Sequence, residues 1–179
     1  MLRFGLLLAG GVFVLDQITK WLVLGPLAFS PPGCREVHAG CGFIEVSPFF
    51  DLRMVWNEGV SFGLLTAGSD LERWGLVALQ GGIAAFFVWW LRTADRKLTA
   101  AALGLVIGGA LGNVIDRVRF GAVVDFLDFS ALAFPWVFNV ADAAINVGAG
   151  LLLLDFLLNG EKKKEPPPET ATQNGPDQA

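Results

Sequence analysis

Residues 98–115 read LTAAALGLVIGGALGNVI, a stretch of eighteen residues that contains no charged side chain. An α-helix needs about 20 predominantly apolar residues to cross the hydrocarbon core of a bilayer. We therefore predict a membrane-spanning helix at this position. Three similar apolar stretches flank it, at about residues 2–24, 74–91 and 137–158. Together they predict an all-α polytopic membrane protein with four transmembrane helices.

The composition of the whole chain agrees with a membrane location. Of its 179 residues, 54% are apolar and 17% are charged, and the mean hydropathy is +0.56. Soluble domains have about 45–50% apolar and about 25% charged residues. A formal net charge of -4 argues against a nucleic-acid partner. One histidine, His38, and two cysteines are too few for the common zinc sites, so we expect no metal and no cofactor.

Basic residues beside the apolar stretches predict the direction of the chain across the membrane. The short connection at residues 92–97 holds three basic residues, and residues 162–164 are all lysine. Short loops rich in lysine and arginine remain in the cytoplasm. This predicts that both termini are cytoplasmic and that residues 25–73 and 118–136 are exported.

The chain is predicted to divide into a transmembrane domain at residues 1–159 and a tail at residues 160–179. The tail is composed mainly of Lys, Glu, Pro, Thr and Gln. Such a composition cannot bury an apolar core. We expect the tail to be a disordered cytoplasmic extension.

The first exported segment contains two short runs of branched and aromatic residues, at 43–46 and 51–56. These runs predict a small extracytoplasmic β-sheet between the first and second helices. Cys34 and Cys41 lie in the same segment. They form either a disulfide in an oxidising compartment or two free thiols, and the sequence leaves both alternatives open.

Several polar residues interrupt the apolar stretches, all toward the exported side. A charge at the bilayer centre costs roughly 2.5–3.5 kcal/mol on insertion scales, so such residues are functional candidates. They fall into three groups with helical spacing: Asp16 and Lys20; Asn113, Asp116 and Arg117; and Asn139, Asp142 and Asn146. A purely structural interpretation is an ion pair within each of the first two groups, Asp16 with Lys20 and Asp116 with Arg117.

Asp125 and Asp142 have no neighbouring cation in the sequence and lie at opposite ends of one short exported loop. Two carboxyl groups brought together in a partly dry site share a proton, which is the chemistry of an aspartic protease. The alternatives are a proton or ion carrier, a scaffold protein, and a Ser/Lys peptidase that uses Ser61 and Lys20.

Five segments resemble, in order, the motifs of lipoprotein signal peptidase (signal peptidase II): residues 16–20 (DQITK), 57–62 (NEGVSF), 108–117 (GGALGNVIDR), 123–126 (VVDF) and 138–142 (FNVAD). The resemblance implies a four-helix aspartic endopeptidase whose catalytic acids are Asp125 and Asp142. We select Asp125 over Asp116 as the partner of Asp142 because Asp116 has Arg117 beside it. The supporting positions that the resemblance implies are Asp16, Lys20, Asn57, Gly108, Asn113, Asp116, Arg117, Asn139 and Ala141.

The resemblance also implies a location, a substrate and an inhibitor. The enzyme is expected in the bacterial inner membrane, with both termini cytoplasmic and its active site at the extracytoplasmic face. Its expected substrate is a prolipoprotein that is cleaved before a cysteine carrying diacylglycerol. Membrane lipid and a globomycin-type inhibitor are expected as further partners.

Overall fold

The computed structural model describes residues 1–27, 29–30, 33–34, 41–59 and 70–159. The predicted tail and Ser61 lie outside this part. The described part has four helices that are long and apolar enough to cross a membrane. They are α1 (Leu2–Leu24), α2 (Asp70–Leu91), α3 (Lys97–Phe120) and α4 (Val140–Asn159). The predicted four-helix membrane fold is confirmed.

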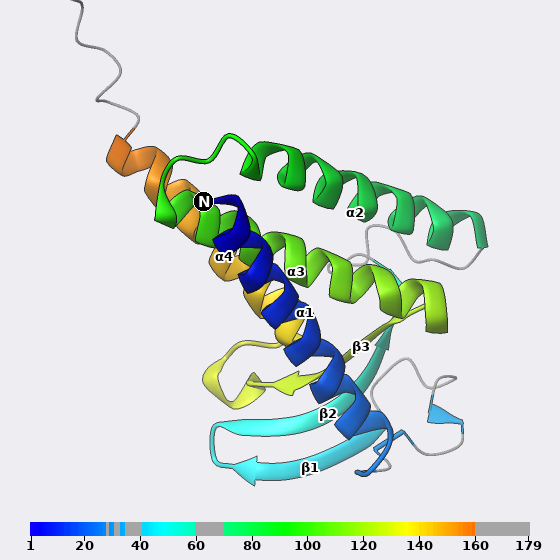
Figure 1. The fold of residues 1–179 in the computed structure, drawn as a ribbon. Helices are drawn as coiled ribbons and strands as arrows, with labels where there is room; N and C mark the ends of the chain where they lie inside the picture. The colour runs from blue at the N-terminus through cyan, green and yellow to red at the C-terminus, as the bar shows by residue number, and fades with distance from the viewer. Residues whose placement is uncertain (28, 31–32, 35–40, 60–69, 160–179) are drawn as a thin grey trace, which may run out of the picture.

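Helix α3 is the centre of the bundle, and α1, α2 and α4 all pack against it (Figure 1). Glycines allow the close approach on two of its faces. A Cβ added to Gly104 would lie 2.6 Å from the backbone oxygen of Gly5 in α1, and one added to Gly109 would meet the backbone oxygen of Ala141 in α4. Small residues at such positions let the backbones of membrane helices come together.

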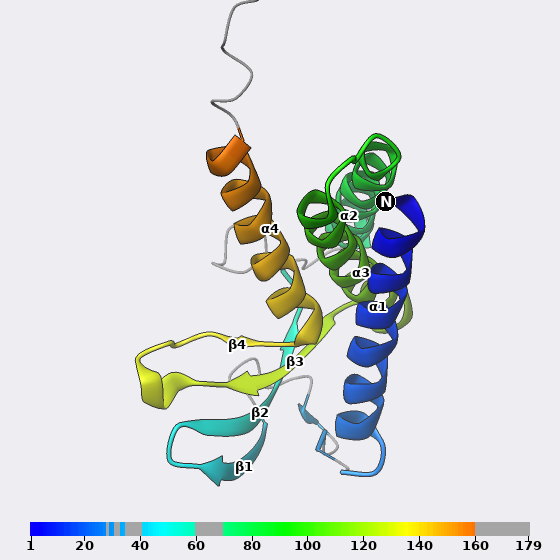
Figure 2. The ribbon, with the colours of Figure 1, turned by 60° about the vertical axis from the view of Figure 1, so that its left-hand side comes forward.

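The described part also contains one antiparallel sheet, with strands in the order β1, β2, β3, β4. The bounds are β1 (Gly42–Ser47), β2 (Phe50–Asn57), β3 (Val123–Asp128) and β4 (Val137–Phe138). The first two confirm the strands predicted between helices one and two. The location predicted for the sheet was incomplete, because two further strands lie between α3 and α4: β3 pairs with β2, and β4, at the start of the predicted fourth span, pairs with β3 (Figure 2).

The strand β3 separates an apolar core from a polar face. Val124 and Phe126 pack into a core with Val23 and Met54, and this core also holds Cys34, which is joined to Cys41 as a disulfide. Successive side chains of a strand point to opposite faces. Asp125, between the two core residues, therefore faces away from this core.

Three helix ends differ by three or more residues from the bounds expected from hydropathy. Helix α2 begins at Asp70, four residues early. Helix α3 continues past Ile115 to Phe120 and ends at Gly121, whose left-handed φ of 76° is the common glycine ending of a helix. Helix α4 begins at Val140 because residues 137–138 pair with β3.

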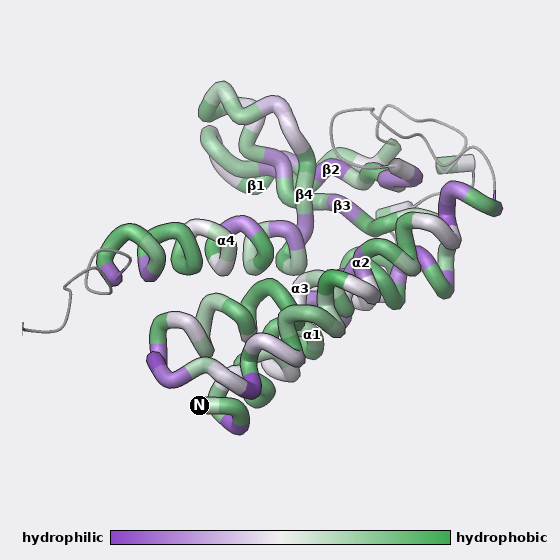
Figure 3. The backbone as a smooth tube through the Cα atoms, turned by 90° about the horizontal axis from the view of Figure 1, so that it is seen from above, coloured by the Kyte–Doolittle hydropathy of each residue, from purple (hydrophilic) through white to green (hydrophobic). Residues whose placement is uncertain are grey.

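The polar residues gather where the helices meet the sheet. Figure 1 shows the start of α1, the α2–α3 connection and the end of α4 at one end of the bundle, with the sheet at the other. In Figure 3 most of the helical tube has the hydrophobic colour, and hydrophilic segments lie around the junction of α4 with β3 and β4. This junction contains Asp125 and Asp142.

Candidate active site

Asp125 lies at the junction of the sheet with α3 and α4, with 2% of its surface exposed. Asn57 Nδ2 donates a hydrogen bond of 3.0 Å to one carboxyl oxygen, and Asn139 Nδ2 donates one of 2.6 Å to the other. Asn57 reaches Asp125 because Val55 is paired with Asp125 across the antiparallel strands, which makes Asn57 a diagonal neighbour. Strand pairing therefore brings together two residues 68 positions apart.

The surroundings of Asp125 favour its protonated form. Burial raises the pKa of the Asp125 carboxyl well above its ordinary value, and the neighbouring charge of Asp142 raises it further. The hydrogen bond from Asn57, the charge of Lys20 and the hydrogen bond from Asn139 oppose this shift. Asp125 and Asp142 thus interact electrostatically at the same site.

Asp142 is held by the first turn of α4. Its backbone N–H donates to Asn139 Oδ1 at 2.9 Å, and its carboxyl Oδ2 accepts the backbone N–H of Asn139 at 3.4 Å. This reciprocal pair is a capping box with Asn139 as the N-cap. Asn139 therefore precedes the helix, whereas the sequence placed it on the helix face with Asp142.

Asn113 completes the connection between the two acids from α3. Its Nδ2 donates to Asp142 Oδ1 at 2.7 Å, and its Oδ1 accepts from Asn139 Nδ2 at 3.2 Å. Asn139 is fully buried and also binds Asp125. Two asparagines thus join the two carboxyl groups in a single hydrogen-bonded network.

Lys20 is the cation of a second, adjacent cluster. Its Nζ lies 2.8 Å from Asp16 Oδ2 and 2.7 Å from Asp116 Oδ2, and all three residues are buried. Gln17 Nε2 donates to both acids at 3.1 Å. The cluster ties α1 to α3, and its Lys20 ammonium also donates to Asn113 at 3.3 Å.

The ion pair expected between Asp116 and Arg117 is wrong. Successive residues on a helix point in different directions and do not face each other. Asp116 faces α1, where it pairs with Lys20, while Arg117 faces α2 and donates to Gln80 Oε1 at 3.0 Å. Arg117 also donates to the backbone oxygen of Gly59 at 2.8 Å.

Gln80 was not predicted as a site residue. Within the predicted second span, residues 74–91, it is the one side chain that is neither aliphatic nor aromatic. That isolation within an apolar stretch was the available signal. The hydrogen bond to Arg117 gives Gln80 a role in fixing the orientation of the guanidinium.

Small residues make room for the network. A Cβ added to Gly108 would meet the backbone oxygen of Ala9, and one added to Gly112 would lie 2.5 Å from Asp16 Oδ2. The backbone N–H of Ala141, which is buried, donates to Asp16 Oδ1 at 3.0 Å. Asp16 thus links α1 to the start of α4, one residue before Asp142.

The network consists of asparagine amides and carboxylates. Within residues 1–27, 29–30, 33–34, 41–59 and 70–159 no group of three or more His, Cys, Asp and Glu side chains is arranged to hold a metal ion. The two carboxyls that interact, Asp125 and Asp142, can exchange protons with a bound water or peptide.

Comparison with known proteins identifies the family. The profile of the family described as signal peptidase (SPase) II matches residues 8–158. The chain belongs to the signal peptidase II family. It is 50% identical over 166 residues to a lipoprotein signal peptidase of Rhizorhabdus wittichii and 45% identical over 163 residues to one of Sphingopyxis alaskensis. Each alignment covers 90% of this chain and 89% of the relative.

A solved structure has a similar fold. A bacterial membrane enzyme determined by the in meso method at 2.3 Å resolution matches with a TM-score of 0.73 and 27% identity. The match covers 91% of this chain and 93% of that one. As a signal peptidase II, the chain is a multi-pass bacterial membrane peptidase of lipoprotein processing.

Proposed function

We propose that this signal peptidase II is an aspartic endopeptidase that cleaves a diacylglyceryl-modified prolipoprotein immediately before the lipidated cysteine. Asp125 and Asp142 are the catalytic pair in this proposal. The observation that carries it is the network of Asn57, Asn113 and Asn139, which connects the two carboxyls and holds Asp125 where the charge of Asp142 acts on it. A shared environment for two acids is what a proton-sharing pair requires.

The two acids have different roles in the proposed reaction. Asp125 is the general acid, because burial and the charge of Asp142 raise its pKa and keep its proton in place. Asp142, half-buried at the start of α4, is the general base. Opposite protonation states in one site allow both steps of proton transfer to occur at the same pH.

The proposed reaction is a single displacement by water. Asp142 takes a proton from the water as its oxygen bonds to the carbonyl carbon before the lipidated cysteine. Asp125 gives its proton to the carbonyl oxygen, which forms a neutral tetrahedral diol. The C–N bond then breaks as Asp142 passes its proton to the departing amine and Asp125 recovers one from the diol. Both carboxyls return to their starting states.

The proposal also sets the direction of the chain. The acids lie at the sheet end of the bundle, opposite the basic α2–α3 connection (Figure 1). With that connection in the cytoplasm, as the positive-inside rule predicts, the acids face outward and both termini lie inside. The acyl chains of the substrate then lie along the helices and bring the scissile bond to the membrane surface, so that binding energy is used for orientation.

A cleavage assay on matched substrates tests the substrate and the cleavage site. The purified full chain is incubated with one prolipoprotein in two forms, with and without diacylglycerol on the cysteine. We expect a product whose mass begins at the lipidated cysteine, formed only from the modified form and inhibited by globomycin. Equal cleavage of the unmodified form, or a product beginning at another residue, contradicts the proposal.

A further inference from the structure

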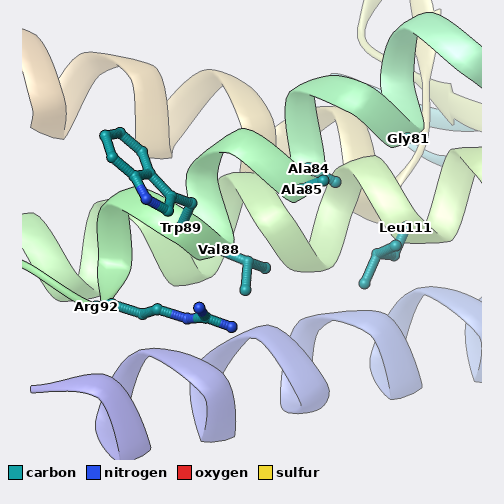
Figure 4. A pocket seen from close by; sticks show the side chains of 7 residues that line it. All are labelled: Gly81, Ala84, Ala85, Val88, Trp89, Arg92 and Leu111. Atoms are coloured by element: carbon teal, nitrogen blue, oxygen red, sulfur yellow. The ribbon is translucent and has the colours of Figure 1, made fainter.

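A groove of about 410 Å³ runs along the half of α2 that leads to its C-terminal end. Seven residues line it: Gly81, Ala84, Ala85, Val88, Trp89, Arg92 and Leu111. Figure 4 shows Val88, Arg92 and Leu111 on the side of α2 and α3 that faces α1. The volume lies within the range of about 300–1,000 Å³ that is usual for pockets binding small ligands.

The groove has the length of one bilayer leaflet. Gly81 and Arg92 are at its two ends along α2, and a helix rises about 1.5 Å per residue, which separates them by about 16 Å. This is roughly half of the hydrocarbon thickness of about 30 Å. The wall between them is apolar, so the groove fits a single acyl chain that extends from the membrane surface to the midplane.

Arg92 supplies a positive charge at the surface end of this apolar wall. Among the described residues no side chain forms an ion pair or a hydrogen bond with its guanidinium. A neighbouring groove, lined by Met1, Leu2, Arg3, Phe4 and Lys97, adds two more cations at this end of the bundle, and no lining residue of either groove is acidic. Trp89, next to Arg92, is exposed, as is typical of tryptophan at a membrane interface.

We propose that this groove is a binding site for an anionic phospholipid. One acyl chain lies along Gly81, Ala85 and Val88, and the phosphate accepts hydrogen bonds from the Arg92 guanidinium. A guanidinium matches the geometry of phosphate oxygens with two parallel hydrogen bonds. The anionic headgroup neutralises a charge that the described part of the protein leaves uncompensated.

This site is separate from the one around Asp125. It lies at the α2–α3 end of the bundle, whereas Asp125 lies at the sheet end (Figure 1). The diacylglyceryl group on a substrate cysteine carries no phosphate, so Arg92 selects a membrane phospholipid. The inference therefore does not depend on the proposed peptidase reaction, and it is tested on enzyme without substrate.

Two neighbouring glycines on α2, Gly81 and Gly82, allow a matched pair of variants that tests whether an acyl chain occupies the groove. A Cβ at Gly81 or at Gly82 would meet nothing within 4 Å, so both positions accept a larger side chain. Gly81 lines the groove and Gly82 does not. Gly81→Leu fills the groove, while Gly82→Leu adds the same side chain outside it and serves as the control for folding.

The measurement is native mass spectrometry of the full chain released from nanodiscs that contain equal amounts of phosphatidylglycerol and phosphatidylcholine with identical acyl chains. We expect one retained phosphatidylglycerol, in about tenfold preference over phosphatidylcholine, because the choline ammonium of phosphatidylcholine cancels the negative charge of the phosphate that binds Arg92; tenfold corresponds to about 1.4 kcal/mol. Gly81→Leu is expected to lose the retained lipid, and Gly82→Leu to keep it. Equal retention in the two leucine variants overturns the acyl-chain assignment.

Substitution of Arg92 tests the headgroup contact. Arg92→Gln is expected to remove the preference for phosphatidylglycerol, whereas Arg119→Gln, which removes one positive charge near the sheet end, is expected to preserve it. An unchanged preference in Arg92→Gln overturns the proposal. So does a second copy of the chain retained in place of lipid, because that outcome makes the groove a protein interface.

Discussion

Asn139 donates a 2.6 Å hydrogen bond to Asp125 from its side-chain nitrogen, while its side-chain oxygen accepts the backbone N–H of Asp142 at 2.9 Å. One side chain thus fixes the position of β3 relative to the first turn of α4. The two acids cannot separate without breaking one of these bonds. Asn139 is a positioning residue in our account.

The two functions of Asn139 can be separated by substitution. Serine is a good N-cap but cannot donate to Asp125 as the amide does, so Asn139→Ser should keep the helix cap and lose the contact. Asn139→Ala loses both, and we expect it to be less stable than Asn139→Ser by about 1 kcal/mol. Both should lower kcat by about tenfold, the rate equivalent of about 1.4 kcal/mol, because Asp125 is no longer held against the first turn of α4. Thermal unfolding in detergent and a cleavage assay check this, and wild-type kcat in Asn139→Ser would contradict it.

Lys20 compensates two buried carboxylates, Asp16 and Asp116, which lie at 2.8 Å and 2.7 Å from its ammonium. Lys20→Met leaves both without a cation. Removing one partner of a buried ion pair costs roughly 3–5 kcal/mol, so we expect a large fall in the unfolding temperature.

The double variant Lys20→Met with Asp116→Asn separates the effect of an unpaired buried charge from the effect of losing the packing of the Lys20 side chain. It removes one of the unpaired charges, and it should recover part of the stability lost in Lys20→Met alone. If Lys20→Met unfolds at the wild-type temperature, the buried cluster does not have the stabilising role that we assign to it.

Gly112 allows α3 to approach Asp16, and an added Cβ there would lie 2.5 Å from Asp16 Oδ2. Gly112→Ala should therefore lower the unfolding temperature and reduce activity. At Gly82 the added atom meets nothing, and Gly82→Ala should be neutral or stabilising by about 0.5–1 kcal/mol, since alanine favours the helix. Parallel unfolding curves of the two variants check this, and equal effects would contradict the packing assignment.

Asp125 should make the folded protein less stable as the pH rises. Its pKa in the folded state is raised by burial and by Asp142, so above the ordinary carboxyl pKa of about 4 the folded state binds more protons than the unfolded state. Stability is then lost as the pH increases toward the raised pKa. Asp125→Asn should reduce this slope, and Asp95→Asn, at an exposed position of the α2–α3 connection, should not. Unfolding temperatures measured across the pH range provide the test, and an unchanged slope in Asp125→Asn would contradict the assignment.

The sequence predicted the helices better than the sheet. Spans of about 20 apolar residues are a local property, and all four were found. The strands at 43–46 and 51–56 were also recognisable from their composition. Strand β4 has two residues and exists because Leu127 and Asp128 pair with it, so no local pattern could reveal it. The end of α3 does have a local signal, because Gly121 follows its last residue and glycine commonly ends helices.

The site was predicted as a set of residues but not as a set of contacts. Asp125 and Asn139 were both named, yet the capping role of Asn139 depends on where α4 begins. The pairing of Asp116 was wrong because its partner, Lys20, lies 96 positions away on another helix. Contacts between helices depend on packing, which residue spacing within one segment does not determine.

In our proposal, Asp125 and Asp142 perform the cleavage and Asp116 does not. The most direct measurement is kcat on the diacylglyceryl-modified prolipoprotein for Asp125→Asn, Asp142→Asn and Asp116→Asn, each corrected for the folded fraction. We predict no detectable turnover in the first two and measurable turnover by the folded fraction of the third. Turnover retained by folded Asp125→Asn or Asp142→Asn would contradict the account.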